Sequence, residues 1–134
     1  GMERDRTTSF EVAQALLENT SQIGDVRIVS GVVEISSVES LRQIADWLRD
    51  KLGSGIVSLG AVVNERPMIL VMATKDVVAR GVHAGNTVYN AAKVMGGGGG
   101  GRPDMAQGGG RDASKLKKAL SVAQETLTRQ LIES

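Results

Sequence analysis

The residues best suited to a chemical role lie in a glycine-rich segment, Gly96 to Gly110, which holds nine of the seventeen glycines in this 134-residue chain. The backbone N–H groups of successive glycines can hold an anion, and glycine also lets a neighbour approach where a Cβ would clash. Cations accompany the glycines, so the segment predicts contacts to phosphate. The candidate phosphate-binding residues are Lys93, Gly99, Gly100, Gly101, Arg102, Gly108, Gly109, Arg111, Lys115 and Lys118.

The segment lacks the signatures of two common phosphate-binding loops. No Gly-Lys-Ser/Thr follows the glycines, as it would in a P-loop, and a helix precedes them where a Rossmann fingerprint has a strand. A flexible linker is disfavoured because Arg-Pro-Asp-Met-Ala-Gln interrupts the glycines and apolar-periodic helices flank them. Two interpretations stay open: an anion cradle, and close packing against a neighbouring element.

Few residues elsewhere suggest catalysis. The chain has no cysteine, which excludes disulfides and thiolate metal sites, and His83 is its only histidine, which disfavours a histidine zinc site or a Ser-His-Asp triad. Asp46 and Asp50 lie opposite an apolar stripe, so we expect them on a solvated helix face. With three aromatic residues in all, base stacking cannot be the main mode of nucleic-acid binding, and recognition of backbone and shape is expected.

The net charge is only +1, but the charges are unevenly distributed. Residues 1–37 carry three basic and six acidic side chains, whereas residues 75–134 carry nine basic and five acidic ones. Lysines also lie near the predicted start of the last helix, where the helix dipole disfavours them. The asymmetry by itself favours a solvated helix face, whereas the placement of the lysines adds support for an anionic partner of the C-terminal half. No apolar run approaches membrane-spanning length and the N-terminus lacks a secretory segment, so a cytoplasmic protein without a membrane partner is expected.

Hydrophobic periodicity predicts the elements that position these residues. Helices are expected over about residues 9–19, 38–52 and 84–95, with a last one after Asp112. Runs rich in Val and Ile predict strands at residues 26–35, 55–63 and 67–74. The last two strands are joined by Asn64-Glu65-Arg66 and should form a β-hairpin.

The predicted fold class is therefore α/β: a small mixed β-sheet of three or more strands with helices packed on it, and a glycine-rich loop before the C-terminal helix. A capping-box pattern at Ser36 and Glu39 is expected to start the second helix. Residues 1–8 are expected to be a tag remnant and flexible start, with Gly1 preceding Met2. Residues 9–134 are expected to form a single domain.

Several strings of this sequence resemble one known family. The run Gly-Gly-Gly-Arg-Pro-Asp-Met-Ala-Gln-Gly-Gly at residues 99–109 follows Thr74-Lys75-Asp76 and His83-Ala84-Gly85. Together with residues 48–57, Leu-Arg-Asp-Lys-Leu-Gly-Ser-Gly-Ile-Val, these strings resemble the C-terminal domain of alanyl-tRNA synthetases, a member of the DHH-associated superfamily. The resemblance covers roughly residues 9–132, although six glycines in a row exceed what the family pattern requires.

The resemblance implies a non-catalytic tRNA-binding domain. In the family this domain docks on the outer corner of the tRNA elbow and helps one tRNA serve both the aminoacylation and the editing site. Alanine-specific tRNA, other domains of the same synthetase and a second copy in a homodimer are the implied partners. The parent enzyme is an ATP-dependent alanine–tRNA ligase, and its ATP, magnesium and zinc sites lie in other domains, so no cofactor is expected in this chain.

Two alternatives remain. One is the substrate-binding domain of a DHH-type phosphoesterase, but that branch typically follows its glycines with His, where this chain has Arg102. The other is a free-standing module for dimerisation or RNA binding, in which the glycines let the last helix pack closely.

Overall fold

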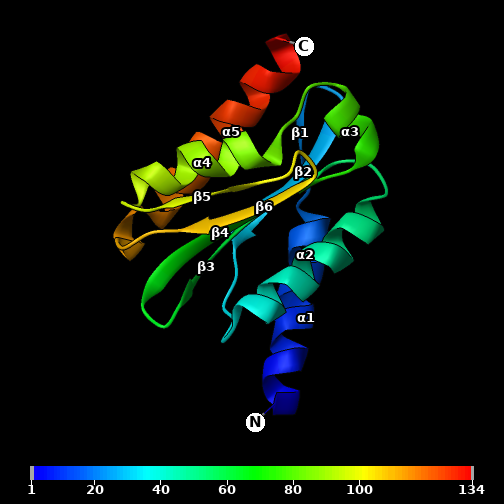
Figure 1. Cartoon of the computed structure of the whole chain (residues 1–134). Helices are drawn as coiled ribbons and strands as arrows, with labels where there is room; N and C mark the ends of the chain where they lie inside the picture. Colours follow the sequence, from blue (N-terminus) through cyan, green and yellow to red (C-terminus); the bar gives the residue numbers. More distant parts are fainter. Residues whose placement is uncertain (1, 134) are drawn as a thin grey trace.

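The computed structural model describes residues 2–133, with side chains from Phe10 onward, as one mixed sheet between two pairs of helices (Figure 1). Six strands lie in the order β1-β2-β3-β4-β6-β5. Their bounds are β1 Ser21–Ile23, β2 Val26–Val32, β3 Ile56–Val63, β4 Arg66–Ala73, β5 Gly98–Gly101 and β6 Met105–Gly109. The β2–β3 pair is parallel and the other four pairs are antiparallel, which confirms the predicted mixed α/β sheet.

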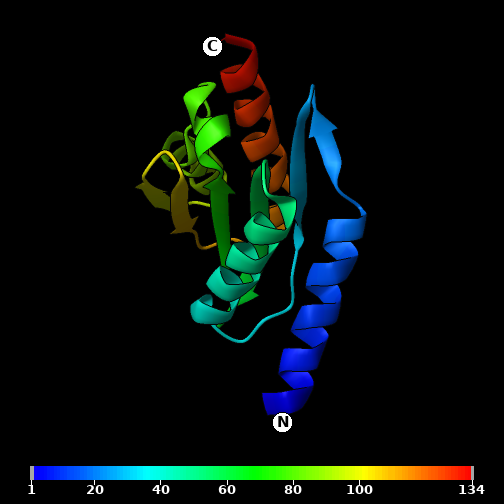
Figure 2. The ribbon, with the colours of Figure 1, turned by 90° about the vertical axis from the view of Figure 1, so that its right-hand side faces the viewer.

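The helices cover the two faces of this sheet in pairs, as the view in Figure 2 shows. Their bounds are α1 Met2–Glu18, α2 Val38–Leu52, α3 Lys75–Ala79, α4 Ala84–Val94 and α5 Leu116–Glu133, the last preceded by a 3₁₀ turn at Ala113–Lys115. One buried cluster joins α4 and α5 to the sheet, and a second joins α1 and α2 to the opposite face. Strands β3 and β4 are buried on both faces along most of their length, as the nearly continuous apolar sequence of residues 67–74 predicts for the second of them.

Helix α2 forms where the sequence predicts it. Its apolar stripe is buried, from Leu41 to Leu52, and Gly53 ends the helix with φ of 72°, a conformation that favours glycine. The N-cap is Ser37, whose Oγ accepts a hydrogen bond from the Ser40 N–H at 3.2 Å. The predicted cap at Ser36 is therefore one residue too early.

Two boundaries differ from the prediction, and two short elements were not predicted. Helix α1 begins at Met2 and not near Ser9, and β2 ends at Val32 and not at Ile35. Strand β1 and helix α3 were not expected, because a three-residue strand and a five-residue helix are too short to give a periodic signal.

The largest difference concerns the glycine-rich segment, which is a β-hairpin and not a loop. Strand β5 consists of four glycines, residues with low intrinsic preference for strands. It nevertheless pairs antiparallel with β6 over Gly98–Gly101, and β6 pairs in turn with β4. Tertiary pairing thus overrides the local preference of the sequence.

Candidate nucleic-acid interface

The glycine hairpin is attached to the N-terminus of α4. The N–H of Ala84 donates to the Pro103 carbonyl at 2.8 Å, and the N–H of Gly85 donates to the Arg102 carbonyl at 3.0 Å. The next amide, from Asn86, donates to Nδ1 of the N-cap residue His83 at 3.0 Å. The turn of the hairpin therefore satisfies the first amides of α4, and His83 has a structural capping role.

Several glycines in the hairpin and in the adjoining start of α4 permit close contacts that leave no room for a side chain. A Cβ at Gly97 would lie 1.9 Å from the Gly109 carbonyl oxygen, and one at Gly85 would lie 2.3 Å from that of Gly101. A Cβ at Gly108 would meet the Val88 side chain of α4 at 2.8 Å. These positions confirm the interpretation of the glycines as sites of close packing.

Two glycines of β5 have no such explanation. A Cβ at Gly98 would meet nothing within 4 Å, and one at Gly100 would meet only the Gly85 carbonyl oxygen, at 4.0 Å. In the β5–β6 register these two residues oppose Gly109 and Gln107, so the four share one face of the sheet. We call this surface, made of Gly98, Gly100, Gln107 and Gly109, the open glycine face.

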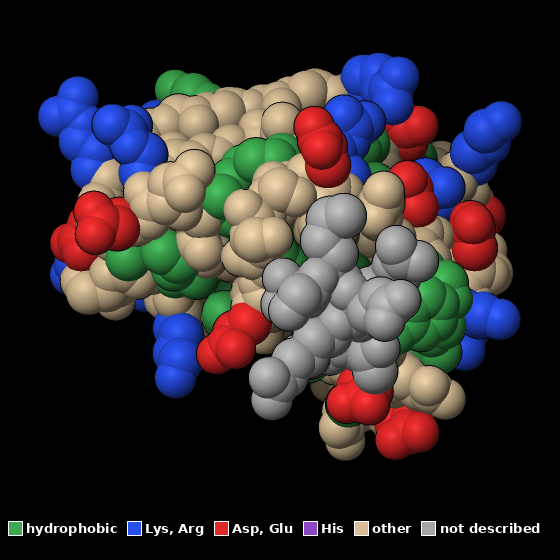
Figure 3. Space-filling model, turned by 90° about the horizontal axis from the view of Figure 1, so that it is seen from below, with side chains coloured by type: hydrophobic (Ala, Val, Ile, Leu, Met, Phe, Trp, Pro, Cys, Tyr) green, Lys and Arg blue, Asp and Glu red, His purple; other side chains and the backbone are tan. Residues whose placement is uncertain are grey.

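The open glycine face is turned away from α4 and toward the side of the sheet that carries α2. Helix α2 packs on β3 and β4, which leaves the outer two strands uncovered by it. In Figure 3, which looks at this side, uncharged tan surface runs along the upper edge, with Lys and Arg side chains toward both ends. The open glycine face consists of backbone apart from the Gln107 side chain, and in sequence it lies between Arg102 at the tip of the hairpin and Arg111 at its base.

Most amides at the base of the hairpin are already hydrogen-bonded, which limits the predicted anion cradle. The N–H groups of Gly96, Gly97 and Gly110 donate to backbone carbonyls at 3.0 to 3.1 Å, and that of Arg111 donates to the Met95 carbonyl at 2.8 Å. An anion bound at this end must therefore be contacted chiefly by side chains.

The predicted cations divide between the two ends of the hairpin. Arg111 and Lys115 follow β6 and are exposed, as is Lys118 in the first turn of α5. Lys93, in the last turn of α4, lies with its Nζ 4.2 Å from the centre of the Tyr89 ring. The structure thus brings these four residues to the base of the hairpin.

Arg102 is separated from that group. It lies at the tip of the hairpin, where its Nε is 3.3 Å from Oδ1 of Asp104. Strand β6 places it roughly 20 Å from the base, at about 3.4 Å per strand residue. A single phosphate therefore cannot bridge Arg102 and Arg111, although a longer strand of nucleic acid could contact both.

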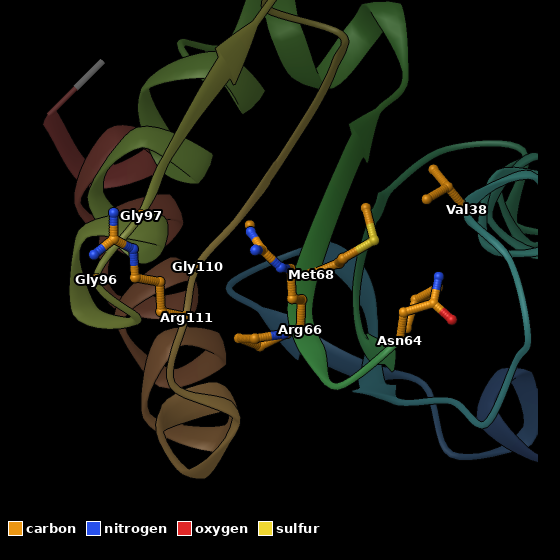
Figure 4. Close-up of a pocket in the computed structure, with 11 residues that line it drawn as sticks. Val38, Asn64, Arg66, Met68, Gly96, Gly97, Gly110 and Arg111 are labelled. Atoms are coloured by element: carbon orange, nitrogen blue, oxygen red, sulfur yellow. The ribbon is translucent and has the colours of Figure 1, made fainter.

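A hollow of about 570 Å³ opens at the base of the hairpin (Figure 4). Gly96, Gly97, Gly110 and Arg111 lie on one side, Arg66 and Met68 of β4 lie in the middle, and Val38 and Asn64 lie on the far side. The remaining lining residues are Val63, Pro67 and Gly109. Sequence reasoning missed Arg66, which it assigned to a turn; the signal available was an arginine at the end of a short polar turn that follows a strand.

The acidic residues with perturbed pKa values hold local structure. A hydrogen bond from the Ser114 hydroxyl, helped by the Ser114 N–H and by Lys115, lowers the pKa of Asp112, which caps the turn before α5. Hydrogen bonds from the hydroxyls of Ser54 and Thr74 lower the pKa of Asp76.

Among residues 2–133 no group of three or more His, Cys, Asp and Glu residues could hold a metal ion. No helix in that range is long and apolar enough to cross a membrane.

Comparison with known proteins gives consistent matches. Residues 25–129 match the DHHA1 domain family. An alanine–tRNA ligase from Alkaliphilus oremlandii is 46% identical over 116 residues, which cover 87% of this chain and 13% of that protein. The chain thus spans about an eighth of the length of this curated relative.

Solved structures agree with the sequence matches. The C-Ala domain of Aquifex aeolicus alanyl-tRNA synthetase superposes with a TM-score of 0.72 at 31% identity, covering 81% of this chain and 97% of that one. RecJ from Thermus thermophilus, solved in complex with Mg²⁺, superposes with a TM-score of 0.59 at 12% identity, covering 95% of this chain and 18% of that one. The second likeness is one of fold alone.

Proposed function

The chain belongs to the DHHA1 domain family, in the group formed by the C-terminal domains of alanyl-tRNA synthetases, and we propose that it binds tRNA without catalysing a reaction. In this proposal the domain docks on the outer corner of the elbow of an alanine-specific tRNA. It thereby helps one tRNA serve the aminoacylation and editing sites of a longer alanine–tRNA ligase. Its partners are then tRNA and the other domains of that ligase, which hold the ATP, magnesium and zinc sites.

The open glycine face is the observation that supports this proposal most. Gly98 and Gly100 lack side chains although neither internal packing nor a positive φ requires this. A partner that approaches the backbone of β5 would require it, because any side chain would hold the partner away. A flat uncharged strip suits a molecule that is recognised by its shape and backbone.

The cations supply the attraction that the uncharged strip lacks. Arg111, Lys115 and Lys118 are exposed at one end of the hairpin, and Arg102 is exposed at the other. Phosphates neutralised by such side chains release counterions, so binding should weaken steeply with salt. The position of the basic groups at the two ends fits a polyanion that extends along the strip.

A salt titration with charge-matched variants tests the proposal. We compare wild type with Arg111→Ala/Lys115→Ala/Lys118→Ala, and measure the affinity for labelled alanine tRNA by fluorescence anisotropy from about 0.05 to 0.3 M KCl. The slope of log affinity against log salt should fall by about two to three units in this variant, because each side chain is assigned to a phosphate.

The matched control removes the same charge elsewhere. Arg42, Lys75 and Arg129 are exposed and lie outside the hairpin, and their triple alanine variant should keep the wild-type slope. Equal slopes in the two triple variants would refute binding at the hairpin. The phosphoesterase and dimerisation alternatives remain predictions, which oligonucleotide cleavage assays and sedimentation would test.

A further inference from the structure

The hollow at the base of the hairpin is larger than phosphate contacts require. Its volume of about 570 Å³ lies within the range of small-molecule sites, roughly 300–1,000 Å³. We propose that it binds one nucleotide, flipped out of the bound RNA, with the phosphate on Arg66 and Arg111 and the base against Val63, Met68 and Asn64. This inference rests on the proposed RNA-binding function and adds a base-binding subsite to it.

The charge of the hollow favours a phosphate. Among its lining residues there are two arginines and no acidic side chain. In the described part of the chain neither Arg66 nor Arg111 forms an ion pair, whereas Arg80 pairs with Asp25 at 3.0 Å. Two exposed guanidinium groups at one hollow, without a carboxylate partner, are suited to bidentate contacts with phosphate oxygens.

The walls of the hollow favour a base beside that phosphate. Val63 and Met68, both half-buried, provide an apolar surface that suits the face of a planar ring, and the flexible thioether of Met68 can adapt to different rings. Asn64 provides an amide that both donates and accepts hydrogen bonds, as recognition of the polar edge of a base requires. The hollow therefore offers a phosphate contact, an apolar wall and an edge contact in one place.

The backbone fixes Asn64 in this position. Asn64 and Glu65 have φ values of 51° and 68°, so the β3–β4 turn is held in the left-handed region. Asparagine tolerates this conformation well, whereas glutamate does so at a cost of about 1–2 kcal/mol. The β3 and β4 strands pair over eight residue pairs up to Val63 and Arg66, which makes the turn a rigid support for the hollow.

The hollow also adjoins the proposed RNA surface. Gly109 belongs both to the open glycine face and to the lining of the hollow, and Arg111 belongs both to the lining and to the basic end of the hairpin. A strand of RNA that follows the face toward Gly109 would therefore reach the hollow.

Nucleotide binding to the isolated chain tests the inference. The four ribonucleoside 5′-monophosphates, the corresponding nucleosides and inorganic phosphate are titrated separately, while the methyl resonances of Val63 and Met68 are followed by NMR. We expect the nucleotides to shift these resonances saturably and to bind at least about tenfold more tightly than either nucleosides or phosphate. Absence of saturable shifts at these two methyl groups would overturn the proposal.

Two variants separate the phosphate and base contacts. Arg66→Ala should weaken nucleotide binding about tenfold, whereas the exposed Arg129→Ala should not change it. Asn64→Gly keeps the left-handed turn. It should weaken the binding of nucleotides and leave the binding of inorganic phosphate unchanged. Wild-type nucleotide affinity in both Arg66→Ala and Asn64→Gly would overturn the proposal.

A parallel measurement separates this inference from the proposed function. If wild type binds alanine tRNA but no nucleotide enters the hollow, the inference fails and the tRNA-binding function stands. If wild type binds neither tRNA nor nucleotides, both fail. If a 2-aminopurine in the RNA changes its fluorescence on binding and Arg66→Ala abolishes that change, the subsite is occupied by RNA as proposed.

Discussion

Replacing Gly100 with valine separates the effect on folding from the effect on RNA binding. A Cβ at this position would have its nearest neighbour at 4.0 Å, and the backbone φ is not in the left-handed region. Removing a glycine from a strand stabilises it by about 0.5–1 kcal/mol, and a β-branched residue suits a strand further. We therefore expect Gly100→Val to raise the melting temperature by about 2–5 °C.

The same change should weaken RNA binding. The valine side chain would project from the open glycine face and hold a flat partner away from the backbone of β5. We expect a loss of at least tenfold in affinity for alanine tRNA, which corresponds to about 1.4 kcal/mol. Increased stability combined with reduced binding is the combination that the structure predicts.

Gly99→Val is the matched control, one residue away on the opposite face. A Cβ at Gly99 would lie 2.4 Å from the Gly108 Cα, so the β5–β6 pair would have to separate. Overpacking of this kind costs about 1–3 kcal/mol, and we expect a lower melting temperature. Thermal unfolding and fluorescence anisotropy measure the two effects. Wild-type tRNA affinity in Gly100→Val, with the fold intact, would refute the assignment of this face to RNA.

Three further changes test the account of the fold. Hydrogen bonds from the Ser54 and Thr74 hydroxyls lower the pKa of Asp76 in the folded state. The contribution of Asp76 to stability is therefore present above the pKa of the unfolded state, about 3.9, and is lost as the pH falls through the lower pKa of the folded state. Asp76→Asn should therefore be less stable to urea than wild type at pH 7, with a difference that narrows as the pH falls below about 3.9. Glu65→Gly should stabilise the chain by about 0.5–1 kcal/mol in urea unfolding, because glutamate has a φ of 68° there; an unchanged midpoint would argue against strain in the turn. Leu127→Ala removes a side chain that is 0% exposed and should cost about 2–5 kcal/mol, whereas a loss below 1 kcal/mol would mean that α5 is loosely packed.

The sequence predicts the main helices and the central strands because their signals are local. The stripe of α2 and the apolar runs of β3 and β4 are periodic over many residues, and Asn64-Glu65-Arg66 is a short polar connection. Strand β5 could not be predicted in this way, because a run of glycines has no periodicity and little preference for strands. Its conformation is imposed by β6 and α4.

The candidate site, too, is predicted by the sequence only where its signal is local. The concentration of glycines and cations near residues 96–118 indicates the segment, but it does not show that Arg102 and Arg111 lie at opposite ends of a hairpin. It also cannot distinguish Gly98 and Gly100, which have free space, from Gly97 and Gly99, which do not. These distinctions depend on distances across the sheet.

Amide chemical-shift mapping can show directly whether the open glycine face contacts tRNA. On titration with alanine tRNA, we expect the largest changes at Gly98, Gly100, Gln107 and Gly109, followed by Arg111. Changes confined to α1 and α2, or to the exposed side of α5, with the hairpin resonances unmoved, would contradict this expectation.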